Sequence, residues 1–359
     1  MTYIFNKITN FHNPNPLFFL CGVKYNEKNP DDDKRVVLKN HLKNKGYYSI
    51  ILEENFIPGM NGQKLGYKFI ELKNLNDVET LACMIVDGIF IIHESHSTAS
   101  EIALFSSNES VAKKVFVLVP DAEIVEENHF SGFLYFGYKD IIKKPITFYP
   151  VIERYIVGEN NSKILTYFNK NEIGGYLSQS IDNYIHKISC TQNLNIVKKG
   201  YNNRNSSIVY YFSSDSEIVA SINVQVLKFY ILALFNISDF RSEFKDTTKF
   251  FEAVSICEKW FKMVLISTIQ ANEKSSIMEY NFRFEILNCV NSRLNLRKAI
   301  SFTFYAFHAI GWISIEPTED RGISLSKKTE ESEGFKAIYS RYSDLINEYE
   351  LLDFEGFIL

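Results

Sequence analysis

The chain has 359 residues, of which 46% are apolar and 23% charged, and this globular composition excludes disorder along the whole chain. Its 39 Lys plus Arg stand against 43 Asp plus Glu, so the net charge of −4 excludes a protein that coats DNA through a general positive charge. The length corresponds to roughly two domains, each with enough chain to bury a core.

The first part of the chain, up to residue 120, alternates short apolar runs with amphipathic stretches. The predicted strands are residues 17–22, 47–52, 87–92 and 114–119, and the predicted helices are residues 31–45, 76–86 and 99–108. Acids begin the first helix, and Lys43, Lys45 and Gly46 end it, as the helix dipole favours. Strand and helix units in succession predict an α/β fold with a doubly wound parallel sheet.

Beyond residue 149 the pattern changes, and residues 158–162 have the composition of a linker. Long stretches with helical apolar periodicity, residues 217–235 and 247–270, predict that this half is mainly helical. The predicted domains are residues 1–150, an α/β domain, and residues 151–359, a helical domain.

Near the C-terminus, residues 297–310 have the pattern of a helix. Two short strands are predicted after it, at residues 311–315 and 323–326. A helix followed by a hairpin is the outline of a winged helix, so a winged-helix-like element is predicted near residues 297–330.

The five cysteines lie far apart and form no C-x-x-C pair, so they are expected to be reduced thiols rather than zinc ligands or a disulfide framework. The longest early apolar run, residues 17–23, is too short to span a bilayer and lacks the flanks of a signal peptide. A cytoplasmic protein without a membrane partner is therefore expected.

Ligands of an open α/β sheet bind beyond the carboxyl ends of the strands, and the residues expected there are mostly polar or acidic. They are Cys21 and Gly22 after the first strand, Glu53 and Glu54 after the second, His93, Glu94, Ser95, His96, Ser97 and Thr98 after the third, and Asp121 after the fourth. The third loop is the richest because it leads into a helix whose first turn is expected to carry Glu101. A glycosidic or phosphate-bearing ligand suits this place.

Glu101 is the candidate catalytic residue. Cleavage at the anomeric carbon of a sugar builds positive charge on the ring, and a carboxylate beneath it traps or stabilises that cation. The alternative is structural, because Ser/Thr-x-x-Glu before an apolar helix is also a capping box. Glu94 has its own alternative, that of a solvated loop acid.

The other motifs give weaker indications of function. His93 and His96 lack a third ligand at a suitable spacing, so no metal is expected. Gly22 is a single glycine and not a dinucleotide fingerprint, and the sequence has neither a Walker motif nor a G-x-S-x-G elbow. Asp87 begins its strand and so belongs to the end of the sheet opposite the site.

Several segments resemble one known family. They are Phe18-Phe-Leu-Cys-Gly22, Leu52-Glu-Glu-Asn-Phe56, Phe133-Leu-Tyr-Phe-Gly137, and the run from Ile92 to Glu109 with Glu94, Ser95, Thr98, Glu101, Phe105, Ser106, Asn108 and Glu109 in characteristic spacing. Over residues 17–140 the chain resembles the nucleoside 2-deoxyribosyltransferase-like effector proteins of bacterial retrons, which are toxins of anti-phage defence.

The resemblance implies a flavodoxin-like domain that hydrolyses the N-glycosidic bond of NAD+ or a related nucleotide, without a further cofactor. It implies catalytic roles for Glu101 and Glu79. Substrate contacts are expected from Cys21, Gly22, Glu53, Glu94, Ser95, Ser97, Thr98 and Asp121. The second half would dock on a restraining complex of the retron reverse transcriptase with its RNA–DNA hybrid, and a homo-oligomer is compatible with this assembly.

The chain departs from stand-alone deoxyribosyltransferases, which carry Asp-x-Gly-Thr before the glutamate. Here Ser95 and Ser97 take the places of the aspartate and the glycine. This argues against transfer between free deoxynucleosides. Two further functions stay open: a sensor that binds a nucleotide without turnover, and a transferase that moves a ribosyl or ADP-ribosyl group to an acceptor.

Overall fold

The computed structural model describes most of the chain in two compact units that are each discontinuous in sequence. The described residues are 2–13, 16–23, 28, 33–56, 66–120, 146–155, 162–166, 168–169, 172–188, 192–200, 206–273, 280–289, 291–316, 322–324, 347–348 and 350–355. The first unit comprises Met1–His12, Asn55–Ile85 and Thr191–Leu359, and the second comprises Asn13–Glu54 and Val86–Cys190. The predicted domains meet at a single boundary near residue 150, whereas these units interleave along the chain.

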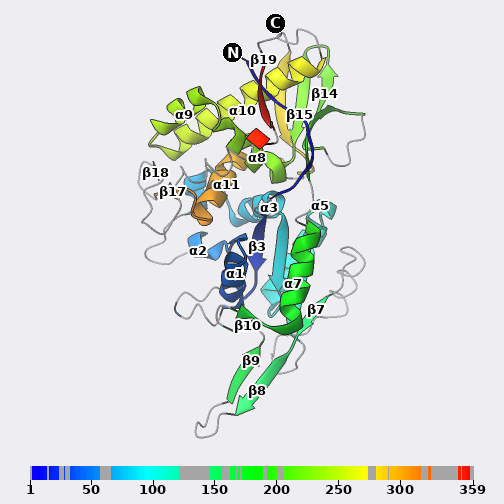
Figure 1. Cartoon of the computed structure of the whole chain (residues 1–359), viewed down its shortest axis with the longest axis vertical. Helices are drawn as coiled ribbons and strands as arrows, with labels where there is room; N and C mark the ends of the chain where they lie inside the picture. Colours follow the sequence, from blue (N-terminus) through cyan, green and yellow to red (C-terminus); the bar gives the residue numbers. More distant parts are fainter. Residues whose placement is uncertain are drawn as a thin grey trace. The chain divides into compact units, whose positions relative to one another are not determined.

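The second unit is built on a five-stranded parallel sheet (Figure 1). Its strands are β3 (Leu17–Cys21), β4 (Tyr48–Ile50), β5 (Gly88–Ile92), β6 (Val115–Pro120) and β7 (Thr147–Tyr149), in the spatial order β4-β3-β5-β6-β7. The four predicted strands are confirmed, and β7 is an addition to them. Counted along the chain, the order is 2-1-3-4-5, so the chain reverses its direction across the sheet between β3 and β5.

Helix α1 (Lys34–Asn44) shows why the predicted helix forms where it does. Asp33 is its N-cap and accepts a hydrogen bond from the backbone N–H of Arg35 at 2.9 Å. At the other end Gly46 has a φ of 82°, a left-handed conformation that favours glycine and ends the helix as predicted.

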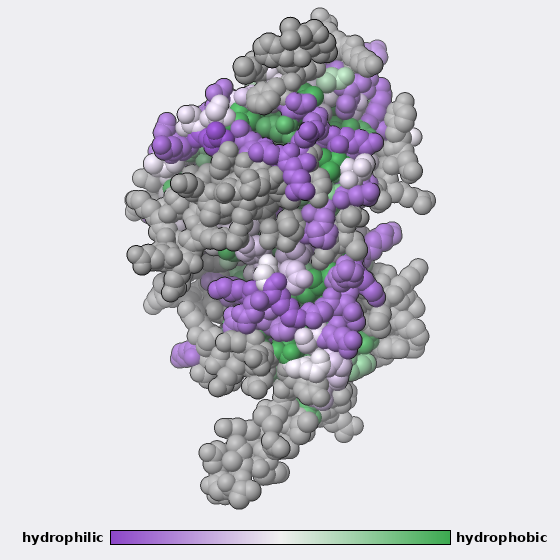
Figure 2. Space-filling model, in the orientation of Figure 1, coloured by the Kyte–Doolittle hydropathy of each residue, from purple (hydrophilic) through white to green (hydrophobic). Residues whose placement is uncertain are grey.

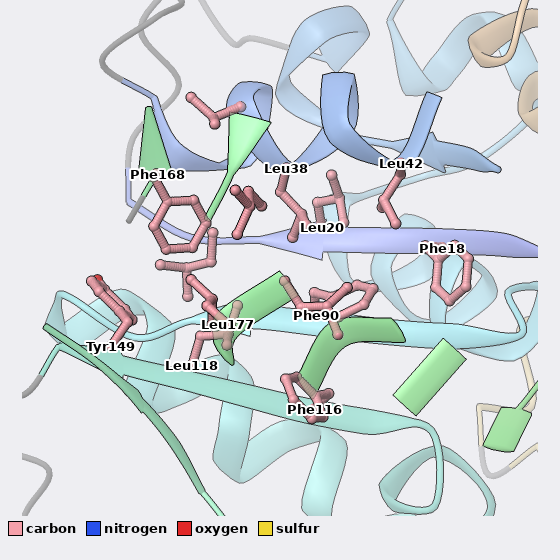
Figure 3. Packing of buried hydrophobic residues seen from close by; sticks show 14 of the residues in the cluster. Phe18, Leu20, Leu38, Leu42, Phe90, Phe116, Leu118, Tyr149, Phe168 and Leu177 are labelled. Atoms are coloured by element: carbon pink, nitrogen blue, oxygen red, sulfur yellow. The ribbon is translucent and has the colours of Figure 1, made fainter. Parts of the chain in front are cut away.

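Buried side chains on one face of the sheet form the core of this unit with α1 and α7 (Gly175–Ile188). Figure 3 shows Leu38 and Leu42 of α1 directed toward Leu20 and Phe18 of β3, with Phe90 of β5 alongside. The opposite face packs against α4 (His96–Ser106), where the ring centroids of Phe19 and Phe105 lie 6.2 Å apart. Helices therefore cover both faces, which is why the strands are almost continuously apolar.

Because Gly88 of β5 has no side chain, α7 can approach the sheet closely. A Cβ on Gly88 would lie 2.4 Å from Cδ1 of Ile188 and 2.6 Å from the hydroxyl of Tyr184. That hydroxyl accepts a hydrogen bond from the backbone N–H of Ile89 at 3.1 Å and donates one to the carbonyl of Lys114. Tyr184 thereby ties α7 to β5 and to the start of β6.

Short elements complete the second unit. They are α2 (Glu53–Phe56), which begins there, α5 (Glu109–Ala112), β8 (Val151–Tyr155), β9 (Ser162–Thr166), β10 (Phe168–Asn169) and β11 (Glu172–Ile173). β8 and β9 form an antiparallel ribbon, and β10 pairs with β11.

The first unit combines helices with a second sheet. The helices are η2 (Tyr67–Ile70), α3 (Leu75–Ile85), α8 (Val224–Leu234), α9 (Ser238–Lys245), α10 (Phe250–Glu273) and α11 (Leu296–Ala309). The four-stranded sheet has the order β13 (Ile196–Lys198), β14 (Ile208–Ser214), β15 (Glu217–Ile222) and β16 (Asn281–Ile286). Two-stranded pairings join β1 (Thr2–Phe5) to β19 (Leu352–Glu355), β2 (Ile8–Phe11) to β12 (Gln192–Leu194), and β17 (Ser314–Ile315) to β18 (Ile323–Ser324).

The four-stranded sheet shows that the prediction of a continuous helix over residues 217–235 is wrong. Residues Glu217–Ile222 form β15, and the helix starts only at Val224. The β-branched residues of this segment favour a strand, and β15 is held between β14 and β16. The predicted helix over residues 247–270 and the helix with a following hairpin near residue 310 are confirmed.

Hydrophilic residues cover much of the described surface on the face drawn in Figure 2. Among the residues that the structure describes, the exposed large hydrophobic side chains are Leu75, Leu104, Phe148, Tyr176, Phe251 and Met263. Among the described residues, the helices are all too short or too polar to cross a membrane.

Replacement of Asp87 by alanine tests the amino end of the sheet. Asp87 is 2% exposed and accepts hydrogen bonds from the Asn13 amide and the Leu17 backbone N–H, both at 2.9 Å. Because the variant strips two buried donors of this acceptor, we expect the free energy of unfolding to fall by about 3 kcal/mol. Chemical denaturation measures it, with Glu109→Ala in the same unit as a control that changes by less than about 1 kcal/mol. Equal effects of the two variants would contradict the assigned role.

Candidate functional site

Several of the residues predicted to hold a ligand lie at the carboxyl edge of the five-stranded sheet, where the chain reverses direction between β3 and β5. Cys21 ends β3 and is buried, and Gly22 follows it. His93 and Glu94 follow β5 and are buried as well. Such a reversal is the place where open α/β sheets bind ligands.

Arg35 is the most deeply buried cation of this edge, with 1% exposure. Its guanidinium donates to both carboxylate oxygens of Asp33, from Nε at 3.2 Å and from Nη2 at 3.1 Å, and to Glu53 Oε1 from Nη1 at 2.7 Å. Burial alone would lower the pKa of Arg35, but Glu53 and Asp33 outweigh it and raise that pKa above its ordinary value. The cation joins the start of α1 to the segment after β4.

Gly22 leaves room for the Arg35 side chain because it has no side chain of its own. A Cβ at this position would lie 2.8 Å from Cδ and 2.9 Å from Cγ of Arg35. Any other residue would therefore displace the stem of the arginine. The predicted site residues Gly22 and Glu53 thus both lie against the Arg35 side chain, Gly22 beside its stem and Glu53 at its guanidinium.

Glu94 is 8% exposed, so the alternative of a solvated loop acid is wrong. Lys34 Nζ lies 2.5 Å from Glu94 Oε1, and the Tyr149 hydroxyl donates to the same oxygen at 2.7 Å. Lys34 is in the first turn of α1 and Tyr149 ends β7. The loop after β5 is therefore fixed from two sides by a charge-assisted hydrogen bond and a buried phenol.

The residues after Glu94 cap α4. Ser95 is the N-cap, its hydroxyl accepts from the backbone N–H of Thr98, and Thr98 Oγ1 accepts from the backbone N–H of Ser95 at 3.2 Å. His93 Nδ1 lies 2.9 Å from Thr98 Oγ1, and the hydroxyls of Ser95 and Ser97 are 2.7 Å apart. The capping box thus belongs to Ser95 and Thr98.

This cap corrects the expected place of Glu101. The helix begins at His96, so Glu101 lies in its second turn rather than the first. Because Thr98 supplies the reciprocal capping bond, the capping explanation of Glu101 is wrong. Glu101 is half-buried on α4, six residues after the N-cap Ser95.

The structure does not bring two of the predicted site residues to this edge. Glu79 is half-buried on α3 and belongs to the first unit, whereas Glu101 belongs to the second. Asp121 lies outside the described residues. Asp87 is at the amino end of β5, as expected, where it binds Asn13 and the backbone of Leu17.

Three site residues were missing from the sequence prediction: Lys34, Arg35 and Tyr149. The two cations follow directly on a run of acids at the start of the first helix, which is a signal for local ion pairs. Tyr149 ends a strand of only three residues, and so short an element gives little periodicity.

Within the described parts of the chain, no group of three or more His, Cys, Asp or Glu side chains is placed to hold a metal ion. Cys21, Cys83, Cys257 and Cys289 are free thiols there. The described edge offers carboxylates, hydroxyls and two cations that already have carboxylate partners.

The structure is that of an α/β protein with acidic side chains at the carboxyl edge of a parallel sheet. Residues 31–259 match the family described as STM3845 retron effector protein, and the chain belongs to this family. It is therefore a retron effector with a role in anti-phage defence, and family membership points to association with retron components. No curated protein sequence matches the chain.

Replacement of Arg35 by methionine tests the buried cation. The variant keeps much of the apolar stem but leaves the Asp33 carboxylate, whose side chain is 1% exposed, without its cation. Breaking a buried pair in this way is expected to lower the free energy of unfolding by about 3 kcal/mol or more. Lys113→Met is the matched control, because the Lys113 side chain is 71% exposed. Denaturant titration of both variants decides, and equal stability would contradict the role given to Arg35.

His93 predicts a dependence of stability on pH. Burial lowers the pKa of His93 below its ordinary value of 6.5; Glu94 opposes this shift and His96 adds to it. The unfolded chain therefore binds the proton more readily, so stability is lost as the pH falls through about 6.5 toward the lowered value. We expect His93→Gln to lose less of its unfolding free energy between pH 7 and pH 5 than the wild type. The exposed His96→Gln is the control, and parallel pH profiles of His93→Gln and the wild type would refute the prediction.

Proposed function

We propose that this retron effector is an N-glycosidase that hydrolyses the bond between the sugar and the base of NAD+ or a related nucleotide, with Glu101 as the catalytic carboxylate. The observation that carries the proposal is the position of Glu101 on α4. This helix starts directly beyond β5, beside the reversal in the sheet, and the capping bonds do not use Glu101.

The strand order 2-1-3-4-5 supports a flavodoxin-like fold of the deoxyribosyltransferase type for this unit. In such a sheet the ligand lies across the ends of β3 and β5. Cys21, Gly22, Ser95, Ser97 and Thr98 would then line the substrate, with Asp121 as a further contact.

The chemistry needs an ionised Glu101. As the glycosidic bond breaks, positive charge builds at C1′ of the ribose, and the carboxylate traps this centre or stabilises it. The base leaves with its bonding electrons as the glycosidic bond breaks. Water then adds to C1′, displacing Glu101 where a bond to it has formed, and gives up a proton, which goes to solvent when the base is neutral nicotinamide and to the departing base otherwise. Glu79 is proposed as a second catalytic carboxylate. Hydrolysis of this kind needs no cofactor, because the nucleotide is itself the substrate.

Glu94 is suited to orient the sugar. Lys34 and Tyr149 both bind Oε1, and a carboxylate retains further acceptor sites on its second oxygen. A ribose hydroxyl that donates to Oε2 would meet an acceptor held rigidly by the two other contacts. Glu53, held by Arg35, is the corresponding acid on the other side of β3.

The remaining part of the proposal concerns how the activity of the effector is inhibited before infection. The helix α11 with the hairpin β17–β18 supports a winged-helix-like element that docks on the retron reverse transcriptase and its RNA–DNA hybrid in the cytoplasm. Release from this complex during infection would start nucleotide depletion.

Two other activities would use the same residues. A nucleotide sensor would bind the ligand at this edge without turnover. A transferase would use Glu101 but pass the ribosyl or ADP-ribosyl group to an acceptor, which intact-mass analysis of candidate acceptors would reveal.

Glu101→Gln tests the reaction, because glutamine keeps the size of the side chain and removes its charge. Wild type and variant are expressed in a bacterial host with and without the neighbouring retron genes, and NAD+, nucleotides and free bases are followed by mass spectrometry. When expressed without the neighbouring retron genes, the wild type is expected to deplete a nucleotide. The variant is expected to cleave that nucleotide at least about 100-fold more slowly.

Glu109→Gln is the matched control, since the side chain of Glu109 is 83% exposed on α5, and it should retain full activity. Turnover by Glu101→Gln at the wild-type rate would overturn the assignment of the catalytic residue. If neither the wild type nor Glu101→Gln cleaves a nucleotide and both bind one equally well, the protein is a nucleotide sensor rather than a hydrolase.

A further inference from the structure

Strand β16 forms one end of the four-stranded sheet of the first unit and runs parallel to β15. The backbone N–H of Asn281 donates to the Ser216 carbonyl at 2.8 Å, and that of Leu287 donates to the Ile222 carbonyl at 2.9 Å. Because backbone groups alternate in direction along a strand, the odd-numbered residues of β16 face β15. The backbone groups of Phe282, Phe284 and Ile286 therefore point away from the sheet.

Within the part of the chain that the structure describes, no strand pairs with this outer edge of β16. An edge of six residues with unpaired backbone groups is a template for another strand. Natural edges are often protected by charged side chains or proline, and β16 carries no proline. Its two charges, Arg283 and Glu285, are of opposite sign and lie 3.2 Å apart on one face.

The charged face is open to solvent. The Arg283 side chain is 53% exposed and that of Glu285 is 44% exposed. On the other face Phe282 and Phe284 stack with their ring centroids 6.2 Å apart, and Lys262 of α10 lies 5.2 Å from the centroid of Phe284. The strand thus alternates apolar and charged residues along an unpaired edge.

This pattern is complementary to itself. If two copies of β16 pair antiparallel about Phe284, Phe282 faces Ile286 of the other copy, and Arg283 faces its Glu285. The outward backbone groups are then the ones that pair, and the two charge pairs occupy the positions between them, where opposing side chains approach most closely. Registers centred on Arg283 or on Glu285 would instead set like charges opposite each other.

We propose that β16 is a homodimer interface, in which two copies of the chain join their sheets edge to edge through a two-fold axis at Phe284. The pairing adds about four backbone hydrogen bonds, counting the outward groups that have no partner in the described residues. The Ile286 carbonyl is left out of that count because it accepts from the backbone N–H of Cys289 at 3.4 Å. The inference is independent of the proposed glycosidase activity.

The test uses charge reversal on the full chain without its retron partners, with mass measured by sedimentation and by light scattering after gel filtration. Arg283→Glu makes both facing positions acidic, and Glu285→Arg makes both basic. We expect a dimer for the wild type and a dissociation constant at least about tenfold higher for each single variant. The double variant Arg283→Glu/Glu285→Arg should restore the dimer.

A mixing experiment separates the interface from any effect on folding. An equimolar mixture of Arg283→Glu and Glu285→Arg places acidic positions opposite basic ones, so a heterodimer should form although neither variant dimerises well alone. Circular dichroism checks that each variant is folded. A monomeric wild type at micromolar concentration, or a dimer that neither single variant weakens, would overturn the proposal.

Discussion

The buried guanidinium of Arg35 is the interaction on which the arrangement of the site depends. It lies between Asp33, the N-cap of α1, and Glu53, the first residue of α2, which follows β4. Since a buried charge is tolerated only with partners, the start of α1 and the end of β4 must stay together. Gly22 completes this constraint, because a side chain there would collide with the arginine stem.

Lys34, the residue before Arg35, holds the loop after β5 in the same way. Lys34 reaches Glu94 after β5, and Tyr149 at the end of β7 binds the same carboxylate. The first turn of α1 therefore organises the loops of both strands that flank the reversal in the sheet. The cap of α4 follows directly on Glu94, so this order extends to the helix that carries Glu101.

Four strands of the five-stranded sheet, β3 to β6, could be predicted because both faces are covered and their apolar runs are continuous, whereas the three-residue strand β7 was not predicted. The candidate loop after β5 was also predictable, since polar residues there follow a buried strand. The acids before Lys34 and Arg35 indicate local ion pairs such as Arg35–Asp33, but the contacts with Glu94 and Glu53 could not be predicted because these two acids are distant in sequence. The segment 217–222 was misread because an apolar strand next to an apolar helix gives one uninterrupted helical pattern.

The pairing of β1 with β19 has a consequence for synthesis of the protein. Thr2 lies opposite Glu355, so this two-stranded sheet cannot form before residue 355 has been synthesised. The ribosome makes the chain from the N-terminus, and every residue of the second unit has been added once Cys190 is reached. The unit that carries Glu101 can thus form on the ribosome before β19, and with it the first unit, is complete.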